Sequence, residues 1–328
     1  MQYKIALAGS SQYTVMMAKI LQKDPRFEIC YTLSPTPKLI GRQQVLTKNP
    51  LQGWSEKENI TSFSVEKKID DTLRDQLSIA SKIDFLLVVD FGYLIPSWLL
   101  KLPKIAPLNI HPSLLPKWRG SSPGQFCLLF RGLGQENAQS AVTIMIMNEG
   151  LDQGPIVAQL TFNCKANWTQ KEYYQHAFTL IAEKLSDLIN DLADKKIKIQ
   201  KQPVESPTMI ARRLDKEDSF IDWQDLQRLM DTNLEKVHSL RDDNKLLNNL
   251  LVDNEVCKDK AEQIKLVINA SRAFSPWPGL WTNVKTNHGE KRMKIFSCHA
   301  NKNQLILDQV QIEGKNPCLF NECKNALS

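Results

Sequence analysis

The chain has 328 residues, of which 42% are hydrophobic and 24% charged, and its net charge is +6. This length suggests two domains, and the composition is that of a globular protein, which argues against extended disorder. The longest apolar runs, such as residues 85–89, are too short to cross a bilayer, and the N-terminus resembles neither a signal peptide nor a transit peptide. We therefore expect a cytoplasmic protein without a membrane partner.

The cysteines, the histidines and the charge distribution restrict the classes of site and partner. Seven cysteines are scattered without a Cys-x-x-Cys pair, and five histidines are dispersed, so we expect reduced thiols and no metal. Residues 1–203 hold 24 Lys and Arg against 18 Asp and Glu, whereas residues 204–328 hold 18 of each. The positive surplus of the first part is compatible with a nucleic-acid partner, but a solvated basic surface explains it equally well.

The first half of the chain alternates strand-like and helix-like segments. Apolar runs predict strands over residues 3–9, 27–33, 82–96, 105–113 and 140–147, and helical spacing predicts helices over 13–22, 123–133 and 170–195. Strands that alternate with helices indicate an α/β domain with a parallel-rich sheet, because parallel strands need crossover connections. Ligands of such sheets bind beyond the carboxyl ends of the strands.

The second part of the chain has a different pattern of predicted elements. A polar, proline-containing stretch near residues 202–207 indicates a boundary, which predicts domains over 1–203 and 204–328. Short strand-like pieces at 219–223, 279–286, 292–300 and 303–314 predict a small β-rich domain or barrel. A polar stretch around 224–262, with leucines at helical intervals, predicts a helical insertion of one or two amphipathic helices.

Three polar side chains follow apolar strands of the first domain: Asn109, His111 and Asp152. An Asn side chain can donate to a developing oxyanion, an imidazole can transfer a proton near pH 7, and a carboxylate can orient that imidazole. This set suits the transfer of an acyl-type carbon to an amine. Taken one by one, each residue also has an ordinary explanation as a strand-end, structural or turn residue.

Longer motifs around these residues are more specific. The stretch NIHPSLLPKWRGSSP, followed about thirty residues later by AVTIMIMNEGLDQGPI, resembles the 10-formyltetrahydrofolate-dependent formyltransferase family. The segments SRAFSPWPGLWT and VQIEGKNP resemble C-terminal motifs of the members that formylate charged initiator tRNA. The resemblance therefore extends over nearly the whole chain.

The resemblance implies a Rossmann-like formyltransferase domain followed by an OB-like β-barrel that helps to hold tRNA. Asn109 would stabilise the tetrahedral oxyanion, His111 would polarise the formyl group and transfer a proton, and Asp152 would position His111. The donor, 10-formyltetrahydrofolate, would bind without a metal. The residues implied to line its site are Phe91, Gly92, Ser113, Leu114, Leu115 and Pro116.

The resemblance also implies a tRNA-contacting loop over residues 36–50. Lys38, Arg42 and Lys48 would neutralise phosphates there, and Arg119 after the Ser-Leu-Leu-Pro loop would contact tRNA as well. The expected partners are thus charged initiator tRNA and the folate donor, and the expected state is a monomer. An exposed basic loop without a tRNA role is the ordinary alternative.

The match departs from the family where the acceptor is recognised. After Gly41 and Arg42 the family usually has a glycine and two lysines, whereas this chain has Gln43, Gln44 and Val45. Asp90 adds a carboxylate beside the implied folate site. Two alternatives therefore stay open: a formyltransferase that acts on a sugar-nucleotide or another small amine, and a non-catalytic RNA-binding relative.

Overall fold

The computed structural model describes residues 2–40, 43–80, 82–134, 138–233, 245–287 and 289–324. The chain divides into two compact units, each built from separate stretches of sequence. The first comprises residues 1–121, 141–161 and 176–210, and the second comprises 122–140, 162–175 and 211–328. The split into domains 1–203 and 204–328 stays a prediction, because these units interleave along the chain.

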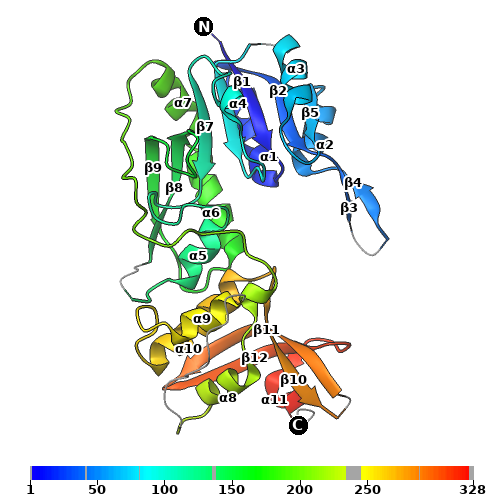
Figure 1. Ribbon diagram of the computed structural model, residues 1–328, viewed down its shortest axis with the longest axis vertical. Coiled ribbons are helices and arrows are strands. Elements are labelled where there is room, and N and C mark those ends of the chain that lie inside the picture. Colours follow the sequence, from blue (N-terminus) through cyan, green and yellow to red (C-terminus); the bar gives the residue numbers. More distant parts are fainter. Residues whose placement is uncertain are drawn as a thin grey trace. The chain divides into compact units, whose positions relative to one another are not determined.

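A seven-stranded sheet forms the centre of the first unit, in the order β5-β2-β1-β6-β7-β8-β9 (Figure 1). Strands β1, β2, β5, β6 and β7 pair in parallel, and β7 pairs antiparallel with β8. The strand bounds are β1 (Tyr3–Gly9), β2 (Phe27–Pro35), β5 (Ser62–Val65), β6 (Phe85–Val89), β7 (Ala106–His111), β8 (Gln139–Ile146) and β9 (Ile156–Asn163). The fold class is therefore α/β with a mostly parallel, Rossmann-like sheet, as predicted.

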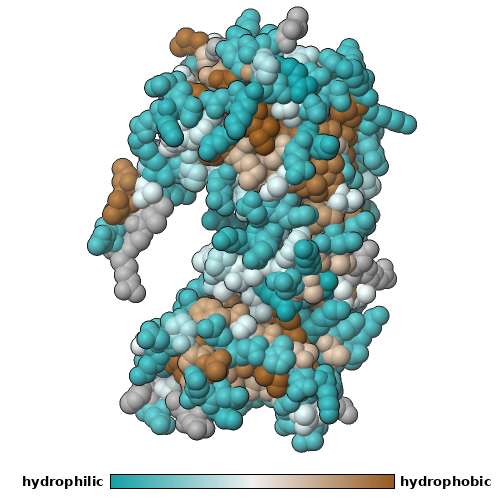
Figure 2. Space-filling model, turned by 180° about the vertical axis from the view of Figure 1, so that it is seen from behind, coloured by the Kyte–Doolittle hydropathy of each residue, from teal (hydrophilic) through white to brown (hydrophobic). Residues whose placement is uncertain are grey.

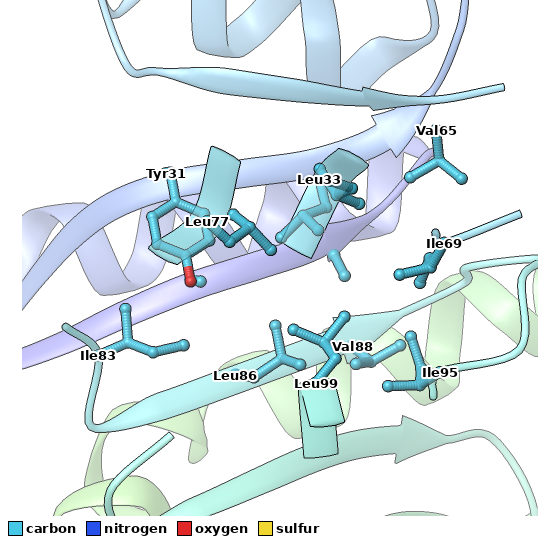
Figure 3. Packing of buried hydrophobic residues seen from close by; sticks show 13 residues of the cluster. Tyr31, Leu33, Val65, Ile69, Leu77, Ile83, Leu86, Val88, Ile95 and Leu99 are labelled. Carbon is cyan, nitrogen blue, oxygen red and sulfur yellow. The ribbon is translucent and has the colours of Figure 1, made fainter. Parts of the chain in front are cut away.

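Helices cover both faces of this sheet. One face packs against α3 (Asp71–Ile79) and α4 (Ser97–Leu100), where Tyr31, Leu33, Leu86 and Val88 of the strands meet Leu77 and Leu99 of the helices (Figure 3). Because side chains alternate along a strand, Ile5 and Leu7 of β1 point to the other face. Helix α1 (Gln12–Lys23) contacts β1, β2 and β6, and packs against α2 (Pro50–Lys57) and α7 (Leu185–Ala193).

The predicted helix over 170–195 is two helices, α6 (Gln170–Ala182) and α7. The break falls at Glu183 and Lys184, where the sequence has no glycine or proline to signal it. The structure also contains a small antiparallel hairpin that the sequence did not predict, β3 (Lys38–Ile40) with β4 (Val45–Thr47). This hairpin projects from the first unit (Figure 1).

The second unit holds an antiparallel four-stranded sheet in the order β10-β11-β12-β13. Its strands are β10 (Leu280–Thr286), β11 (Gly289–Asn301), β12 (Gln304–Ile312) and β13 (Cys318–Leu319). The expectation of a small β-rich C-terminal domain is confirmed. Residues 219–223, however, are no strand, because a short 3-10 helix occupies Glu217–Ser219 and only Phe220 bridges to Trp281.

Helices pack around the second sheet. The bounds are α5 (Pro123–Leu129), α8 (Trp223–Met230), α9 (Leu246–Val252), α10 (Lys260–Ala273) and α11 (Phe320–Cys323). Within the range 224–262 of the predicted helical insertion the structure has α8, α9 and the start of α10, and residues 234–244 lie outside the described residues. Helix α5 belongs to this unit because the Asn269 amide on α10 donates to the carbonyls of Leu129 and Arg131. Among the described residues, no helix is long and apolar enough to cross a membrane.

Candidate active site

Strand β7 brings Asn109 and His111 to the carboxyl end of the first sheet. Leu108 and Ile110 of this strand are buried, and Asn109 on the other face is half-buried and in register with Val88 of β6. Asn109 and His111 are two positions apart, so their side chains point to the same face of the sheet. Across the described ranges the Asn109 amide makes no hydrogen bond to protein, which leaves its donors available to a ligand.

The imidazole of His111 is buried and fixed from two sides. Its Nε2 lies 3.1 Å from the Trp118 carbonyl oxygen, to which it donates, and its Nδ1 lies 3.8 Å from Oδ2 of Asp152. The second distance is too long for a hydrogen bond, but it is within the range at which a carboxylate stabilises a positive ring. The structure therefore brings together the predicted pair His111 and Asp152.

Asp152 sits in a turn between β8 and β9 with a left-handed backbone, at φ +51°. Its Oδ2 accepts a hydrogen bond of 2.8 Å from the Gly120 amide. Gly154, two residues on, has no space for a side chain, because a Cβ would lie 1.7 Å from the Ile146 carbonyl oxygen. Contacts on both sides thus determine where the Asp152 carboxylate points.

Residues 113–120, which we call the site loop, follow the end of β7 and finish at Gly120. The side chains of Ser113 and Leu115 are buried, and the Ser113 hydroxyl donates to the Lys117 carbonyl. Thr143 of β8 donates to the Ser113 carbonyl, and Gln159 of β9 donates to the Leu115 carbonyl. That Ser113 and Leu115 line the donor site stays a prediction, and the structure buries both side chains within the protein. Leu114 and Pro116 remain partly exposed.

The segment after β6 forms the other predicted wall of the donor site. Phe91 is half-buried against the ring of Tyr93, with 5.3 Å between centroids, and Gly92 is exposed. Asp90 has a left-handed backbone at φ +51°, and its carbonyl accepts from the Ser10 hydroxyl. Neighbouring protein limits the hydration of the Asp90 carboxyl and raises its pKa, which a hydrogen bond from Ser11 partly offsets.

Arg119 does not lie on the surface, where a tRNA phosphate would be bound. Its relative exposure is 1%, and its guanidinium donates to the carbonyls of Pro203 and Val204 and to Oε1 of Gln202. Burial lowers the pKa of Arg119, and the charge of Asp152 opposes this shift. The predicted tRNA contact is therefore wrong for this side chain, because its donors are already engaged inside the first unit.

The remaining predicted tRNA contacts lie on or beside the β3–β4 hairpin. Lys38 is exposed, whereas Lys48 forms an ion pair of 2.6 Å with Glu56 of α2. Arg42 lies outside the described residues. The exposed polar side chains of the described hairpin are Lys38, Gln43, Gln44 and Thr47. Three further exposed side chains are apolar, and Figure 2 shows a brown patch on the projecting arm. These three are Leu39, Val45 and Leu46, at 58%, 56% and 66% exposure.

Residues 202–208, which we call the strap, contribute contacts that sequence reasoning missed. Gln202 donates to the carbonyls of Asp152 and Gly154, Ser206 donates to the Pro116 carbonyl, and Thr208 accepts from the Trp118 amide. The sequence presents this stretch as a polar boundary, and only its amide and hydroxyl side chains hint at a structural role. Among the described residues, no cluster of His, Cys, Asp or Glu could hold a metal ion.

Comparison with known proteins gives consistent findings. Residues 3–187 match the pattern of the family described as Formyl transferase. A methionyl-tRNA formyltransferase of Ehrlichia ruminantium (strain Gardel) is 34% identical over 158 residues, and one of Legionella pneumophila (strain Corby) is 24% identical over 315 residues. The match covers 48% of this chain and 50% of the Ehrlichia protein, against 94% and 91% for the Legionella protein. The chain thus spans half the length of the first relative and about nine-tenths of the second.

A solved structure resembles the fold over most of the chain. It is the N-formyltransferase from Helicobacter canadensis in complex with folinic acid and dTDP-3-aminofucose, with a TM-score of 0.57 at 14% identity. The alignment covers 92% of this chain and 88% of that one. At this identity the likeness concerns the fold alone.

Proposed function

Because the chain belongs to the formyl transferase family, we propose that it transfers a formyl group from 10-formyltetrahydrofolate to the α-amine of methionyl-tRNA. The observation that carries this proposal is the arrangement at the end of β7. The Asn109 amide is half-buried and has no hydrogen-bond partner within the described part of the chain, and it lies on the same strand as a buried imidazole that faces a carboxylate. Acyl transfer to an amine needs an oxyanion donor and a proton carrier, and this site supplies both.

The proposed reaction proceeds through a tetrahedral intermediate. The neutral amine nitrogen attacks the formyl carbon, a carbon–nitrogen bond forms, and negative charge develops on the formyl oxygen. The Asn109 amide donates to that oxygen, and His111 transfers the proton that the attacking nitrogen loses. The bond from the formyl carbon to N10 of the folate then breaks, and N10 takes up a proton. Asp152 stabilises the positive imidazole while it holds this proton.

The residues around the site loop fit a flat, largely apolar donor. We propose that Phe91, Gly92, Leu114 and Pro116 contact the folate, because each is partly or fully exposed at this edge of the sheet. A Cβ at Gly92 would meet no atom within 4 Å, so the space beside its backbone is open. Ser113 and Leu115 are proposed to support this wall from inside. The donor supplies the formyl carbon, and the proposed reaction uses no metal.

The acceptor and its contacts are proposed on different grounds. Relatives named methionyl-tRNA formyltransferase, one of them matched over 94% of this chain, support methionyl-tRNA as the acceptor. We propose that the partner is the charged initiator tRNA and that the enzyme is a monomer. We propose that Lys38 and Arg42 contact phosphates of the tRNA. Lys48 would first have to leave Glu56. A small amine, such as an amino group on a sugar-nucleotide, is the second candidate acceptor, because uncharged Gln43, Gln44 and Val45 follow Arg42 where the family usually has two lysines.

Competition between acceptors tests the proposal. The purified protein receives 10-formyltetrahydrofolate with a labelled formyl carbon, together with charged initiator tRNA, charged elongator tRNA and an amino-sugar nucleotide in one reaction. We expect label on the methionine of initiator tRNA. Label on the sugar alone would favour the second candidate, and RNA binding without transfer to any amine would favour a non-catalytic relative. Either result would overturn methionyl-tRNA as the acceptor.

A further inference from the structure

The strap follows α7 at the end of the first unit and is hydrogen-bonded along the site loop. The Ser206 hydroxyl donates to the Pro116 carbonyl at 3.0 Å, and the Trp118 amide donates to the Thr208 hydroxyl at 2.8 Å. Trp118 is in turn the residue whose carbonyl accepts from His111. The strap therefore contacts the backbone that holds the imidazole.

Gln202, the first residue of the strap, connects the site loop to the turn that carries Asp152. Its Nε2 donates to the Asp152 carbonyl at 3.0 Å and to the Gly154 carbonyl at 2.7 Å. Its Oε1 accepts from the Arg119 guanidinium at 3.0 Å. The Gln202 amide therefore donates to the turn that carries Asp152 and accepts from the site loop. These bonds fix the distance between the two segments.

The turn that carries Asp152 is one that needs such support. A non-glycine residue in the left-handed region costs free energy and persists where the surroundings over-determine it. At Asp152 these surroundings are the Gln202 amide on the backbone carbonyl and the Gly120 amide on the carboxylate. If the Gln202 donors are removed, the turn is free to relax to an ordinary backbone conformation, and the carboxylate moves away from His111.

Arg119 completes the arrangement from the other side. Its guanidinium is buried and has no carboxylate within hydrogen-bond distance among the described residues. The interaction between its charge and that of Asp152 is attractive, and it opposes the lowering of the Arg119 pKa by burial. Gln202 lies between the two charged residues and contacts both segments.

We propose that Gln202 is a positioning residue, which sets the Asp152 carboxylate against His111 for formyl transfer. The inference rests on the proposed function, because it assigns a catalytic consequence to the position of Asp152. Gln202 itself is expected to touch neither the donor nor the acceptor. A purely structural Gln202 would lower stability when replaced, but its effect on the rate would not depend on Asp152.

A double-mutant cycle separates these cases. Gln202→Met removes both the donors and the acceptor at similar size, and Gln202→Glu keeps the acceptor for Arg119 but loses the donors to Asp152 and Gly154. Glu205→Gln changes an exposed residue of the same strap and serves as the matched control. The rate of formyl transfer is measured under single-turnover conditions in the native protein and in an Asp152→Asn background.

In the native background we expect both Gln202 variants to lower the single-turnover rate by about tenfold to hundredfold, since a misplaced group of this kind typically costs that much. The KM for each substrate should change less than about twofold, because direct binding contacts are not removed. In the Asp152→Asn background the same variants should lower the rate less than about twofold further, because their effect acts through the carboxylate.

Two results would overturn the inference. One is a native rate in Gln202→Glu, and the other is an equal fold-loss in both backgrounds. If Gln202→Met fails to fold, Gln202→Glu decides, because it keeps the acceptor for the buried guanidinium. Full activity of Asp152→Asn alone would instead contradict the role of Asp152 in the proposed function, so the two failures are distinguishable.

Discussion

The site loop and the β3–β4 hairpin belong to the same unit, but they are held in opposite ways. Backbone atoms of the site loop accept from Thr143, Gln159 and Ser206, and its buried Arg119 bonds to the strap. The described hairpin exposes Leu39, Val45 and Leu46 and pairs only its own two strands. The loop beside the proposed catalytic residues is held by hydrogen bonds from the rest of the unit, whereas the described arm is held by the pairing of its own two strands.

Among the predicted effects, the loss of kcat in Asn109→Ala, beside the site loop, should be the largest. Removing one donor to an oxyanion typically lowers kcat by about a hundredfold to a thousandfold. Stability should be nearly unchanged, because the Asn109 amide makes no hydrogen bond to the described protein. Steady-state formylation and thermal unfolding of the same preparation check this. A variant with native kcat would remove Asn109 from the mechanism.

Arg119→Ala should lower the free energy of unfolding. It should not specifically weaken tRNA binding. The substitution removes a buried side chain together with its hydrogen bonds to the Pro203 and Val204 carbonyls, at a cost of about 3 kcal/mol in the free energy of unfolding. Denaturant unfolding measures this loss, and the exposed control Lys201→Ala should show none of it. Native stability with a raised KM for tRNA would restore the original prediction for Arg119.

Gln43→Lys combined with Val45→Lys should affect binding and leave stability alone. Both residues are exposed, and the added charges lie on the arm proposed to meet tRNA phosphates. At low salt we expect the KM for charged tRNA to fall by about threefold to tenfold, with a steeper salt dependence and an unchanged Tm. An unchanged KM at every salt concentration would place the tRNA away from this hairpin.

Asp90→Asn should have the smallest effect, a gain in stability beside the site. The folded protein raises the pKa of Asp90 above its ordinary value of 3.8, so the ionised carboxylate costs stability at neutral pH. The protonated form is present in both states below pH 3.8, and there the difference from Asn vanishes. We expect Tm to rise by about 1–2 °C at pH 7. A lower Tm at pH 7 would contradict this sign.

The sequence predicts the chemical residues better than the residues that support them. Asn109 and His111 end an apolar strand within a long motif, and Asp152 ends the next strand-turn segment, so pattern alone brought attention to them. The contact of His111 with Asp152 does not follow from the strand order, because β7 and β8 are antiparallel and end at opposite edges of the sheet, so the turn after β8 must bring Asp152 back to His111. Their chemical roles remain proposals.

The remaining features depend on contacts between distant parts of the chain, which local patterns do not contain. The family resemblance predicts a tRNA contact for Arg119, whereas strap carbonyls some eighty residues away accept hydrogen bonds from its guanidinium. The strap was taken for a boundary because proline and polar residues usually mark one. Helix α5 was assigned to the first domain by its neighbours in sequence, whereas its contacts with α10 place it in the second unit.

The single-turnover formylation of charged initiator tRNA tests the central claim most directly. It is measured with 10-formyltetrahydrofolate and excess enzyme, comparing the native protein with Asp152→Ala and with the exposed control Glu205→Gln. We predict rapid transfer by the native protein and by Glu205→Gln, and a rate at least about a hundredfold lower for Asp152→Ala. Equal rates in all three proteins, or no transfer to methionyl-tRNA by the native protein, would contradict the account.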